Sequence, residues 1–404
     1  MADAGFYLKM PLKAGTGGTP GANNSTELYE AEFSRRSKNR NQKLMDLRIV
    51  IAAGGTGGHL FPGIAVAREF VARHGAAVTF LTSPKGMATR ILEGAGFPWE
   101  AVASRALKGQ GLFARLGTWW QLPKSIREAR ERLQTLNPHL VLGMGGYTSG
   151  PVGLAAWSLK LPLTLHEQNA LPGFTNRWLA RCADRVFVSF PASLDYFRRN
   201  LAVWTGNPAR EEFFQERPSR PASPFTVLIT GGSQGAHHLN LEVLAALDEL
   251  TDLKDRLRFL HLTGEADREM VDAGYRAGGF PAKVEAFSSE MPELLAQAHL
   301  TVCRAGASTL AELTAVGRAA LVVPYPFAAN NHQEVNARFL AETGAAELIL
   351  NKDFTGARFA SKIREFMARP ETLARMEAAA RRLAKPAAAK EIVEGCLELI
   401  EGNK

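Results

Sequence analysis

From Leu47 onward, short apolar runs rich in β-branched residues alternate with amphipathic stretches of helix length. A second series of such runs begins near Phe225. The runs read LRIVIAA, AVTFL, LVLGM, LPLTLH and RVFVSF in the first series, and FTVLIT, RFLHLT, KVEAF, LTVCRAG and AALVVPYP in the second. Runs without polar alternation are typical of parallel strands buried on both faces by helices. The pattern therefore predicts two α/β units, each with a parallel sheet.

The two series open alike, which indicates an internal repeat. Residues 47–59 read LRIVIAAGGTGGH and residues 226–237 read TVLITGGSQGAH. Each is an apolar strand that runs into a Gly-Gly pair, a hydroxyl residue and a further glycine. This repeat predicts two Rossmann-like domains, which we place at residues 45–205 and 206–386 because the stretch TGNP at 205–208 is rich in turn residues.

The last segment predicts a helix that Pro386 can start, over residues 387–404. One face of this helix is apolar and consists of Ile392, Val393, Cys396, Leu397 and Ile400. Such a face needs an apolar partner, so we expect the helix to pack back on the first domain.

Composition narrows the class of protein. A hydrophobic fraction of 46% and a charged fraction of 22% are those of a globular protein, and no run approaches the ~20 apolar residues of a membrane span. The N-terminus does not resemble a secretory signal. The three cysteines are widely separated, which favours a reducing cytoplasm over a disulfide framework. The net charge of +8 predicts an anionic partner.

Residues 1–44 differ from the rest of the chain. Gly, Asn, Ser and Thr crowd positions 14–26, and five cations follow between Arg35 and Lys43. We predict a disordered extension. Because Met45 directly precedes the first strand, a misassigned start codon is one alternative, and a basic arm that tethers the chain to a membrane is another.

Three glycine-rich loops follow predicted strands. Gly54, Gly55, Gly57 and Gly58 precede a helix expected from about Pro62, and the loops at 231–235 and 143–147 are similar. The free N–H groups at such a helix start favour phosphate, although tight turns also use glycine. The dinucleotide fingerprint lacks its last glycine, which Leu60 replaces, and no P-loop signature occurs. These gaps argue against an NAD enzyme and an ATPase.

Six motifs occur together and in order: GGTGGHLFPGIAVA at 54–67, GMGGYTSGP at 143–151, HEQNALPG at 166–173, GNPAR at 206–210, GGSQGAHHLN at 231–240 and CRAGASTLAE at 303–312. Through them the chain resembles the bacterial peptidoglycan N-acetylglucosaminyltransferases over nearly all of residues 45–400. The resemblance implies a GT-B fold, two Rossmann-like domains with parallel sheets facing across a cleft. It also implies transfer of GlcNAc from UDP-GlcNAc to undecaprenyl-pyrophosphoryl-MurNAc-pentapeptide, which converts lipid I to lipid II.

The resemblance assigns the donor to the second domain. Glu312 would bind the ribose hydroxyls, although an acid near a helix start also suits the dipole. The amides of Ala307, Ser308 and Thr309 would face the diphosphate. Ser233 would bind the diphosphate, cap its helix, or do both. Arg210 would be a donor-site cation, with an interdomain salt bridge as the alternative.

Further donor contacts follow from the same motifs. Gln333 would read the sugar hydroxyls, since an amide both donates and accepts. Ser288 would contribute its backbone to the uracil pocket; the family commonly has Ile there. Asn169 would touch the donor sugar. The first glycine loop completes the expected set with Thr56, Gly57 and Gly58.

The expected chemistry is one inverting displacement by the C4 hydroxyl of MurNAc. His59, next to a glycine loop, is the candidate general base, with backbone ordering of that loop as the alternative. Glu167 would orient the acceptor or His59. Helix N-termini and Ser233 would stabilise the departing diphosphate. We expect neither a metal nor a cofactor, because no Asp-x-Asp motif follows a strand.

Residues 107–132 mix cations with apolar and aromatic side chains, a composition that suits an anionic bilayer surface. The predicted membrane patch consists of Leu112, Phe113, Leu116, Trp119 and Trp120. An ordinary core-packing helix with a basic face is the alternative. We expect a peripheral protein on the cytoplasmic face of the inner membrane, with proteins of cell-wall synthesis as further partners.

Two rival functions remain. A UDP-GlcNAc 2-epimerase, or another GT-B enzyme acting on lipids, would share the fold. A nucleic-acid-binding protein would account for the charge, but the chain has no helix-turn-helix or RNA-recognition signature, so we expect no nucleic-acid partner.

Overall fold

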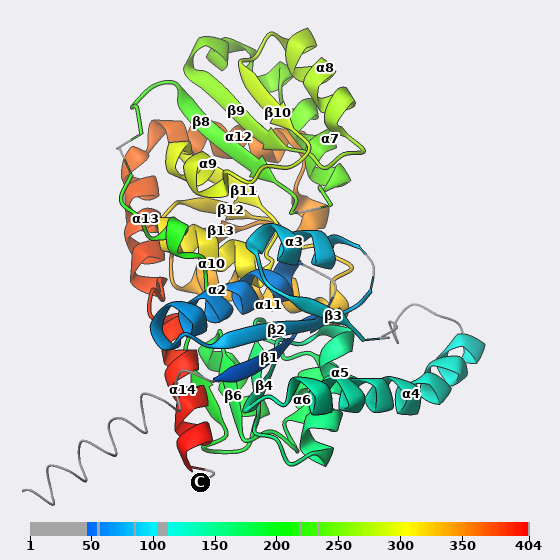
Figure 1. The fold of residues 1–404 in the computed structure, drawn as a ribbon. Helices are drawn as coiled ribbons and strands as arrows, with labels where there is room; N and C mark the ends of the chain where they lie inside the picture. The colour runs from blue at the N-terminus through cyan, green and yellow to red at the C-terminus, as the bar shows by residue number, and fades with distance from the viewer. Residues whose placement is uncertain are drawn as a thin grey trace, which may run out of the picture. The chain divides into compact units, whose positions relative to one another are not determined.

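A computed structural model describes residues 47–54, 57–84, 86–102, 112–217, 220–232 and 234–402 (Figure 1). Of residues 112–121 it describes the helical backbone alone. The described residues form two parallel sheets, with strand orders β3-β2-β1-β4-β5-β6-β7 and β10-β9-β8-β11-β12-β13. These sheets confirm the prediction of two α/β units.

The first unit holds the seven-stranded sheet. Its strands are β1 (Arg48–Ala52), β2 (Ala77–Thr82), β3 (Trp99–Ala101), β4 (Leu140–Gly143), β5 (Leu163–Glu167), β6 (Arg185–Val188) and β7 (Ala202–Trp204). Its helices are α2 (Gly57–His74), α3 (Met87–Ala95), α4 (Leu112–Leu136), α5 (Gly146–Ser158) and α6 (Phe174–Leu179), with a 3₁₀ turn at Pro191–Tyr196.

The second unit holds the six-stranded sheet. Its strands are β8 (Phe225–Thr230), β9 (Leu257–Leu262), β10 (Ala282–Glu285), β11 (Leu300–Cys303), β12 (Ala320–Val322) and β13 (Ala346–Leu348). The helices are α7 (His237–Ala245), α8 (Arg268–Gly278), α9 (Met291–Gln297), α10 (Ala307–Val316), α11 (His332–Glu342), α12 (Gly356–Ala368) and α13 (Pro370–Leu383). The last helix in the chain, α14 (Ala388–Gly402), packs on the first unit. Short 3₁₀ segments lie at Glu211–Phe213, Asp248–Arg256, Ala329–Asn331 and Asn351–Asp353.

The central strands are buried along their whole length because helices cover both faces of each sheet. Every residue of β8 is buried, and β4, β5, β11 and β12 are likewise buried throughout. Side chains such as Phe70, Phe80 and Phe259 have no exposed surface. Burying each of them stabilises the fold by about 1.5–3 kcal/mol. All ten apolar runs of the sequence form strands.

Three strands, β3, β7 and β13, were not expected from the sequence. Each has three residues and lies at an edge of its sheet. An edge strand pairs on one side only and needs no long apolar run. Their sequences, WEA, AVW and AEL, therefore carry little strand signal.

Helix α2 begins at Gly57, so the expected start near Pro62 is wrong. Pro62 lies inside the helix, where its missing N–H leaves the carbonyl of Gly58 without the usual i+4 donor. The hydroxyl of Ser308 in α10 donates to that carbonyl at 3.1 Å. A contact from a distant part of the chain thus satisfies the carbonyl that the proline releases.

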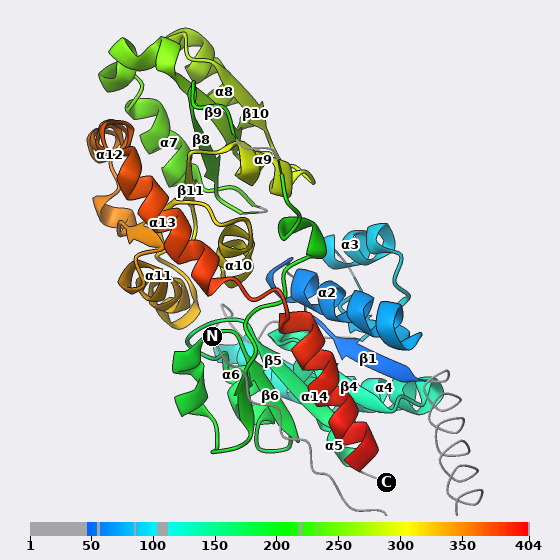
Figure 2. The same cartoon turned by 90° about the vertical axis from the view of Figure 1, so that its left-hand side faces the viewer.

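Helix α14 packs on the first unit (Figure 2). Its buried Ile392, Val393 and Cys396 belong to one apolar cluster with Leu47 and Phe70. The opposite edge of the contact is polar, since the Arg185 guanidinium donates to the Gly395 carbonyl at 3.0 Å. This is the apolar partner that the sequence required; the domain limits themselves stay a prediction.

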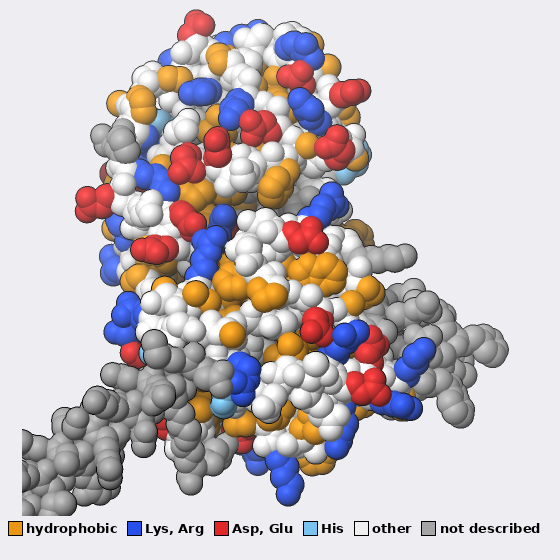
Figure 3. Space-filling model, viewed as in Figure 1, with side chains coloured by type: hydrophobic (Ala, Val, Ile, Leu, Met, Phe, Trp, Pro, Cys, Tyr) orange, Lys and Arg blue, Asp and Glu red, His pale blue; other side chains and the backbone are white. Residues whose placement is uncertain are grey.

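The charge of the surface is mixed on the face shown in Figure 3, where cationic and anionic side chains alternate over the second unit. Within the described residues, no helix combines the length and the apolar character that crossing a bilayer requires.

Candidate active site

Two glycine loops of the first unit touch through their backbones at the carboxyl ends of β1 and β4. The Gly54 amide donates to the Gly145 carbonyl at 3.3 Å. A Cβ on Gly54 would lie 3.1 Å from the Cα of Gly146, and Gly145 and Gly146 both have positive φ, of 87° and 77°. Side chains would separate these loops. The carboxyl edge of an open α/β sheet is where ligands bind.

His59 lies in the first turn of α2 and is held by one amide. Its Nδ1 lies 2.9 Å from Oε1 of Gln168, and Nε2 of Gln168 donates to the carbonyl of Met144 at 2.9 Å. The second bond orients the amide, so its oxygen faces the histidine and must accept a proton from Nδ1. His59 therefore carries its proton on Nδ1, and Nε2 is the basic nitrogen.

The same amide also sets the tautomer of His166, which is fully buried. Nε2 of Gln168 lies 2.9 Å from Nδ1 of His166, which accepts, so Nε2 of His166 donates to the Gly206 carbonyl at 3.3 Å. Burial lowers the pKa of His166 to about 4. A chain of neutral hydrogen bonds thus runs from Gly206, in the segment that joins the two units, to His59.

The electrostatic surroundings keep His59 neutral. Burial lowers the pKa of His59 below its ordinary value of 6.5, while the hydrogen bond to Gln168 and the charge of Glu167 oppose that shift. His332, at the start of α11, lowers the pKa further. A neutral imidazole with an unprotonated Nε2 is the form that a general base needs.

Glu167 holds a loop together. One carboxylate oxygen accepts from the Asn169 amide at 2.9 Å, and the other accepts from the Gly173 amide at 3.0 Å and from Asn176 Nδ2 at 2.9 Å. The side chain is almost fully buried. The hydrogen bond to His59 comes from its neighbour Gln168, which the motif analysis did not single out.

Asn169 is connected to the second unit through Asn336 of α11. Nδ2 of Asn336 donates to Oδ1 of Asn169 and to the Ala305 carbonyl, both at 3.1 Å, and its Oδ1 accepts from the Ala170 amide at 2.8 Å. Asn336 has no exposed surface. Sequence reasoning missed this residue; the available signal was a polar side chain on the apolar face that Ala337 and Leu340 share.

Helix α10 starts at Ala307, with three residues between it and the end of β11, and has Gly306 at its N-cap. Ala307, Ser308 and Thr309 therefore occupy the first turn, where backbone N–H groups have no partner within the helix. The sequence predicted this turn correctly. The hydrogen bond from Ser308 to Gly58 brings it beside the first turn of α2, which contains His59.

Glu312 lies one turn further along α10, with the positive charge of Arg210 acting on it. Burial raises the pKa of Glu312 from 4.5 to about 7, and Arg210 opposes the shift. The guanidinium of Arg210 lies over the rings of Phe61 and Phe213, 5.4 and 4.9 Å from their centroids. A carboxyl with such a raised pKa marks a candidate functional site.

The loop after β12 is anchored by two side chains. Oε1 of Gln333 accepts from the Tyr325 amide at 2.9 Å, which leaves its NH₂ group to donate elsewhere. Buried Arg304 donates to the carbonyls of Val323 and Pro324 and to Oδ1 of Asn351. The sequence did not assign Arg304 a role of its own.

The remaining predicted residues are placed as follows. Ser288 is buried and its hydroxyl accepts from the Glu290 amide at 3.2 Å, beside the exposed ring of Phe287. Thr56 and Ser233 lie outside the described residues. The side chains of Leu112, Phe113, Leu116, Trp119 and Trp120 are also outside the description; their backbone forms the first part of α4.

Comparison with known proteins decides the family. The N-terminal domain of glycosyltransferase family 28 matches residues 49–188, and its C-terminal domain matches residues 226–392. The chain belongs to glycosyltransferase family 28. The family match and the two parallel sheets together confirm the predicted GT-B fold. The family match also confirms the prediction that the enzyme is a glycosyltransferase.

Relatives within family 28 share most of the chain. The UDP-N-acetylglucosamine–N-acetylmuramyl-(pentapeptide) pyrophosphoryl-undecaprenol N-acetylglucosamine transferase of Anaeromyxobacter sp. strain Fw109-5 is 45% identical over 88% of this chain and 94% of its own. The protein of that name from Myxococcus xanthus is 43% identical over 88% and 93%. The crystal structure of Acinetobacter baumannii MurG is 32% identical, with a TM-score of 0.71 over 87% of this chain and 99% of that one.

A different activity occurs on the same fold. A putative UDP-N-acetylglucosamine 2-epimerase from Listeria monocytogenes has a TM-score of 0.62 at 16% identity, over 86% of this chain and 95% of that one. At that identity the likeness concerns the fold alone.

Proposed function

We propose that this family 28 enzyme transfers GlcNAc from UDP-GlcNAc to the C4 hydroxyl of MurNAc in undecaprenyl-pyrophosphoryl-MurNAc-pentapeptide, and so makes lipid II from lipid I. The observation that carries the proposal is the hydrogen bond between Ser308 and Gly58. It places a helix start suited to a diphosphate beside the turn that holds a neutral, oriented His59. The names of the 40–45% identical relatives supply the substrates.

The donor fits the second unit by its chemistry. The first-turn amides of α10 favour the negative charge that develops on the departing UDP, and Arg210 adds a cation. Glu312 offers two acceptor oxygens to the cis-diol of the ribose once it is ionised. The NH₂ group of Gln333 is available for a sugar hydroxyl.

The acceptor step is proton removal during a single displacement. The C4 hydroxyl attacks the anomeric carbon, UDP leaves with the electron pair of the glycosidic bond, and Nε2 of His59 takes the hydroxyl proton. Gln168 acts through His59, because it holds the Nδ1–H tautomer. One displacement inverts the α linkage of the donor and yields a β-linked disaccharide.

Peripheral binding to the cytoplasmic face of the inner membrane belongs to the same proposal. A polyprenyl acceptor resides in a bilayer, so the enzyme must reach its surface. The apolar and basic sequence between residues 107 and 132 supports an anionic lipid contact. Binding to proteins of cell-wall synthesis stays a prediction from the family resemblance.

Product analysis tests the function against the epimerase. The full chain is incubated with UDP-GlcNAc, with or without a lipid I analogue, and the products are separated by mass spectrometry and chromatography. We expect a β-linked GlcNAc–MurNAc product that requires the analogue, and no UDP-ManNAc. Formation of UDP-ManNAc without the analogue would reject the transferase. His59→Ala should abolish the product, and His74→Ala, at the other end of α2, serves as the matched control.

A further inference from the structure

Basic side chains lie in the short segments that lead into four neighbouring strands of the second sheet. Arg220 precedes β8, Arg256 precedes β9, His299 precedes β11 and Arg318 precedes β12. These strands are adjacent and parallel, in the order β9-β8-β11-β12. Their amino ends therefore meet at one edge of the sheet. The candidate donor site lies at the opposite, carboxyl edge.

A cavity of about 350 Å³ lies at this amino edge. Its lining includes Arg220, Arg256 and His299, the carboxylate of Glu377, and apolar side chains such as Phe225 and Phe366. The volume is at the lower end of the ~300–1,000 Å³ typical of small-molecule sites. The lining thus combines two arginines, the carboxylate that pairs with Arg220, and an apolar wall.

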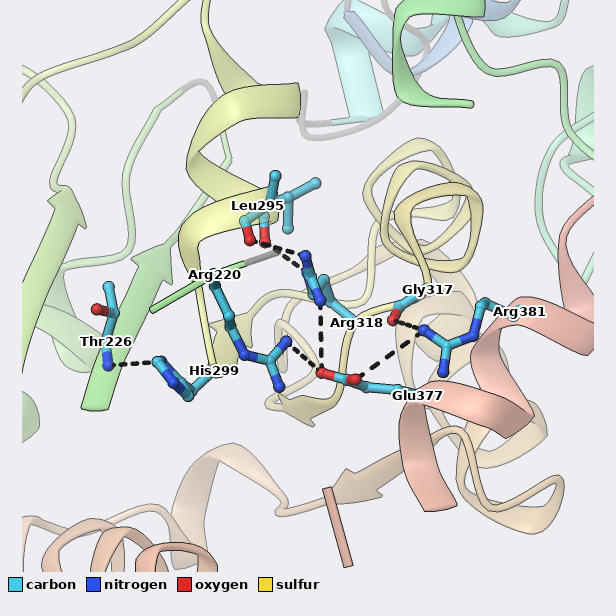
Figure 4. Close-up of polar contacts among 9 residues, drawn as sticks. Arg220, Thr226, Leu295, His299, Gly317, Arg318, Glu377 and Arg381 are labelled. Atoms are coloured by element: carbon cyan, nitrogen blue, oxygen red, sulfur yellow. Dashed lines mark hydrogen bonds and ion pairs between the residues drawn. The ribbon is translucent and has the colours of Figure 1, made fainter. Parts of the chain in front are cut away.

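At this edge of the sheet, three arginines surround a single carboxylate, that of Glu377 (Figure 4). Glu377 of α13 is mostly buried, and its Oε1 lies 2.6 Å from Nη1 of Arg220 and 3.7 Å from Nη1 of Arg318. Its Oε2 lies 4.0 Å from Nη1 of Arg381. One carboxylate among three guanidinium groups leaves a positive excess. Burial lowers the pKa of Arg318, and repulsion from Arg220 lowers it further.

Two of these arginines have structural tasks. Arg318 donates to the carbonyls of Leu295 and Ala296, near the C-terminus of α9, at 3.0 and 2.7 Å. Arg381 donates to the Gly317 carbonyl at 3.4 Å. Arg256 differs, because its side chain is exposed and the nearby carboxylate of Asp252, on which its charge acts, pairs with Arg364 instead. Of the two arginines that line the cavity, Arg220 is paired with Glu377, and Arg256 is the one whose charge the fold leaves available for a ligand.

His299 contributes a neutral ring to the same cavity. Its Nδ1 accepts from the Thr226 amide at 3.0 Å, so the proton of the neutral ring is on Nε2. The ring stacks on Phe225, with centroids 5.0 Å apart and 29° between the planes. The pair forms a flat aromatic wall beside Arg220.

We propose that this cavity is a second ligand site, which binds a small organic anion whose phosphate or carboxylate group is attached to an apolar ring. Arg220 and Arg256 hold the anionic group by charge-assisted hydrogen bonds. The ring lies against Phe225 and Phe366. The anion offsets the positive excess around Glu377. The site is separate from the donor site and does not depend on the proposed reaction.

Calorimetric titration with phenyl phosphate tests this site. The full chain is first saturated with UDP, so that the donor site is blocked. We expect saturable binding of one phenyl phosphate, weaker binding of inorganic phosphate, and none of benzyl alcohol, which has the ring without the charge. Benzoate in a parallel titration separates a preference for carboxylate from one for phosphate.

Matched variants locate the binding. Arg256→Gln removes an exposed side chain and should weaken phenyl phosphate binding about tenfold, the equivalent of one lost charge-assisted contact. Arg358→Gln, exposed near the start of α12, makes the same charge change and should leave binding unaltered. Equal affinity in the parent and in Arg256→Gln, or no saturable binding beside UDP, overturns the proposal.

Discussion

The hydroxyl of Ser308 donates to the carbonyl of Gly58 at 3.1 Å, and this bond exists because Pro62 cannot supply the usual helical donor. It joins the start of α10 to the start of α2, the two helix ends that the proposed reaction needs together. The proline in the GGTGGHLFPG motif thus has a structural consequence on the other unit.

A double-mutant cycle tests this relationship. Ser308→Ala should lower kcat/KM by an amount equivalent to about 0.5–1 kcal/mol of transition-state stabilisation, the usual contribution of one neutral hydrogen bond. In a Pro62→Ala background the restored amide of residue 62 occupies the Gly58 carbonyl, so Ser308→Ala should then cost less. The measurement is kcat/KM for UDP-GlcNAc in the four proteins. Equal costs in both backgrounds would show that the two residues are not coupled.

Gln168 should act on the rate through His59. Gln168→Leu removes the acceptor that holds the proton on Nδ1, so we expect kcat to fall about 10- to 100-fold while UDP affinity stays unchanged. Because the pKa of His59 lies below 6.5, the acid limb of kcat/KM in the parent should fall below that pH. A Gln168→Leu variant that keeps both the full kcat and the acid limb of the parent would contradict a positioning role for Gln168.

Glu312 should make donor binding depend on pH. With a pKa of about 7, its carboxyl is largely protonated at pH 6 and ionised at pH 8. If the ionised form binds the ribose diol, UDP affinity rises by up to about tenfold over that interval. Calorimetric titration of UDP at pH 6, 7 and 8 measures this. Glu312→Gln should bind weakly with a flat pH profile; a profile that keeps its slope would assign the titration to another group.

Ionised Glu312 should lower the free energy of unfolding at high pH. The folded pKa, about 7, exceeds the ordinary 4.5, so the folded state holds the extra proton and its stability falls as pH rises from 4.5 to 7. Glu312→Gln should therefore raise the free energy of unfolding by about 1–2 kcal/mol at pH 8, a value discounted because the residue is partly exposed, and by little at pH 4.5. Urea unfolding at both pH values checks the sign; equal effects would contradict it.

The stability of the protein should depend on the side-chain amide of Asn336, which both donates and accepts hydrogen bonds. In Asn336→Asp, one oxygen keeps the Ala170 amide, but the other faces the acceptor oxygens of Asn169 and Ala305. A buried charge with this one donor and two facing acceptor oxygens should destabilise the protein by about 3 kcal/mol at pH 7. Since a protonated Asp can donate, part of the loss should return at pH 5. Urea unfolding at both pH values measures it, and a loss independent of pH would refute the account.

The sequence predicted the strands and glycine loops, whose patterns recur along the chain. It did not predict contacts between side chains that are distant in sequence and close in space. Buried parallel strands can be predicted from their apolar runs. The first turn of α10 can be predicted because an apolar strand, a glycine and a helical stretch follow one another in the sequence. The roles of Gln168 and Asn336 depend on partners more than 20 residues away. A local pattern can mark Asn336 as a polar residue on an apolar face, but it cannot show which groups the residue binds. Glu167 was recognised as important, but only its contacts show that it holds the 169–176 loop.

Acceptor-dependent release of UDP tests the central claim most directly. The initial rate of UDP release from UDP-GlcNAc is measured with the full chain, with and without a lipid I analogue at saturating donor. We expect UDP release to rise from near background to steady turnover when the analogue is added. Glu312→Gln and His59→Ala should each suppress this acceptor-dependent release. Release at the same rate without the analogue would contradict it.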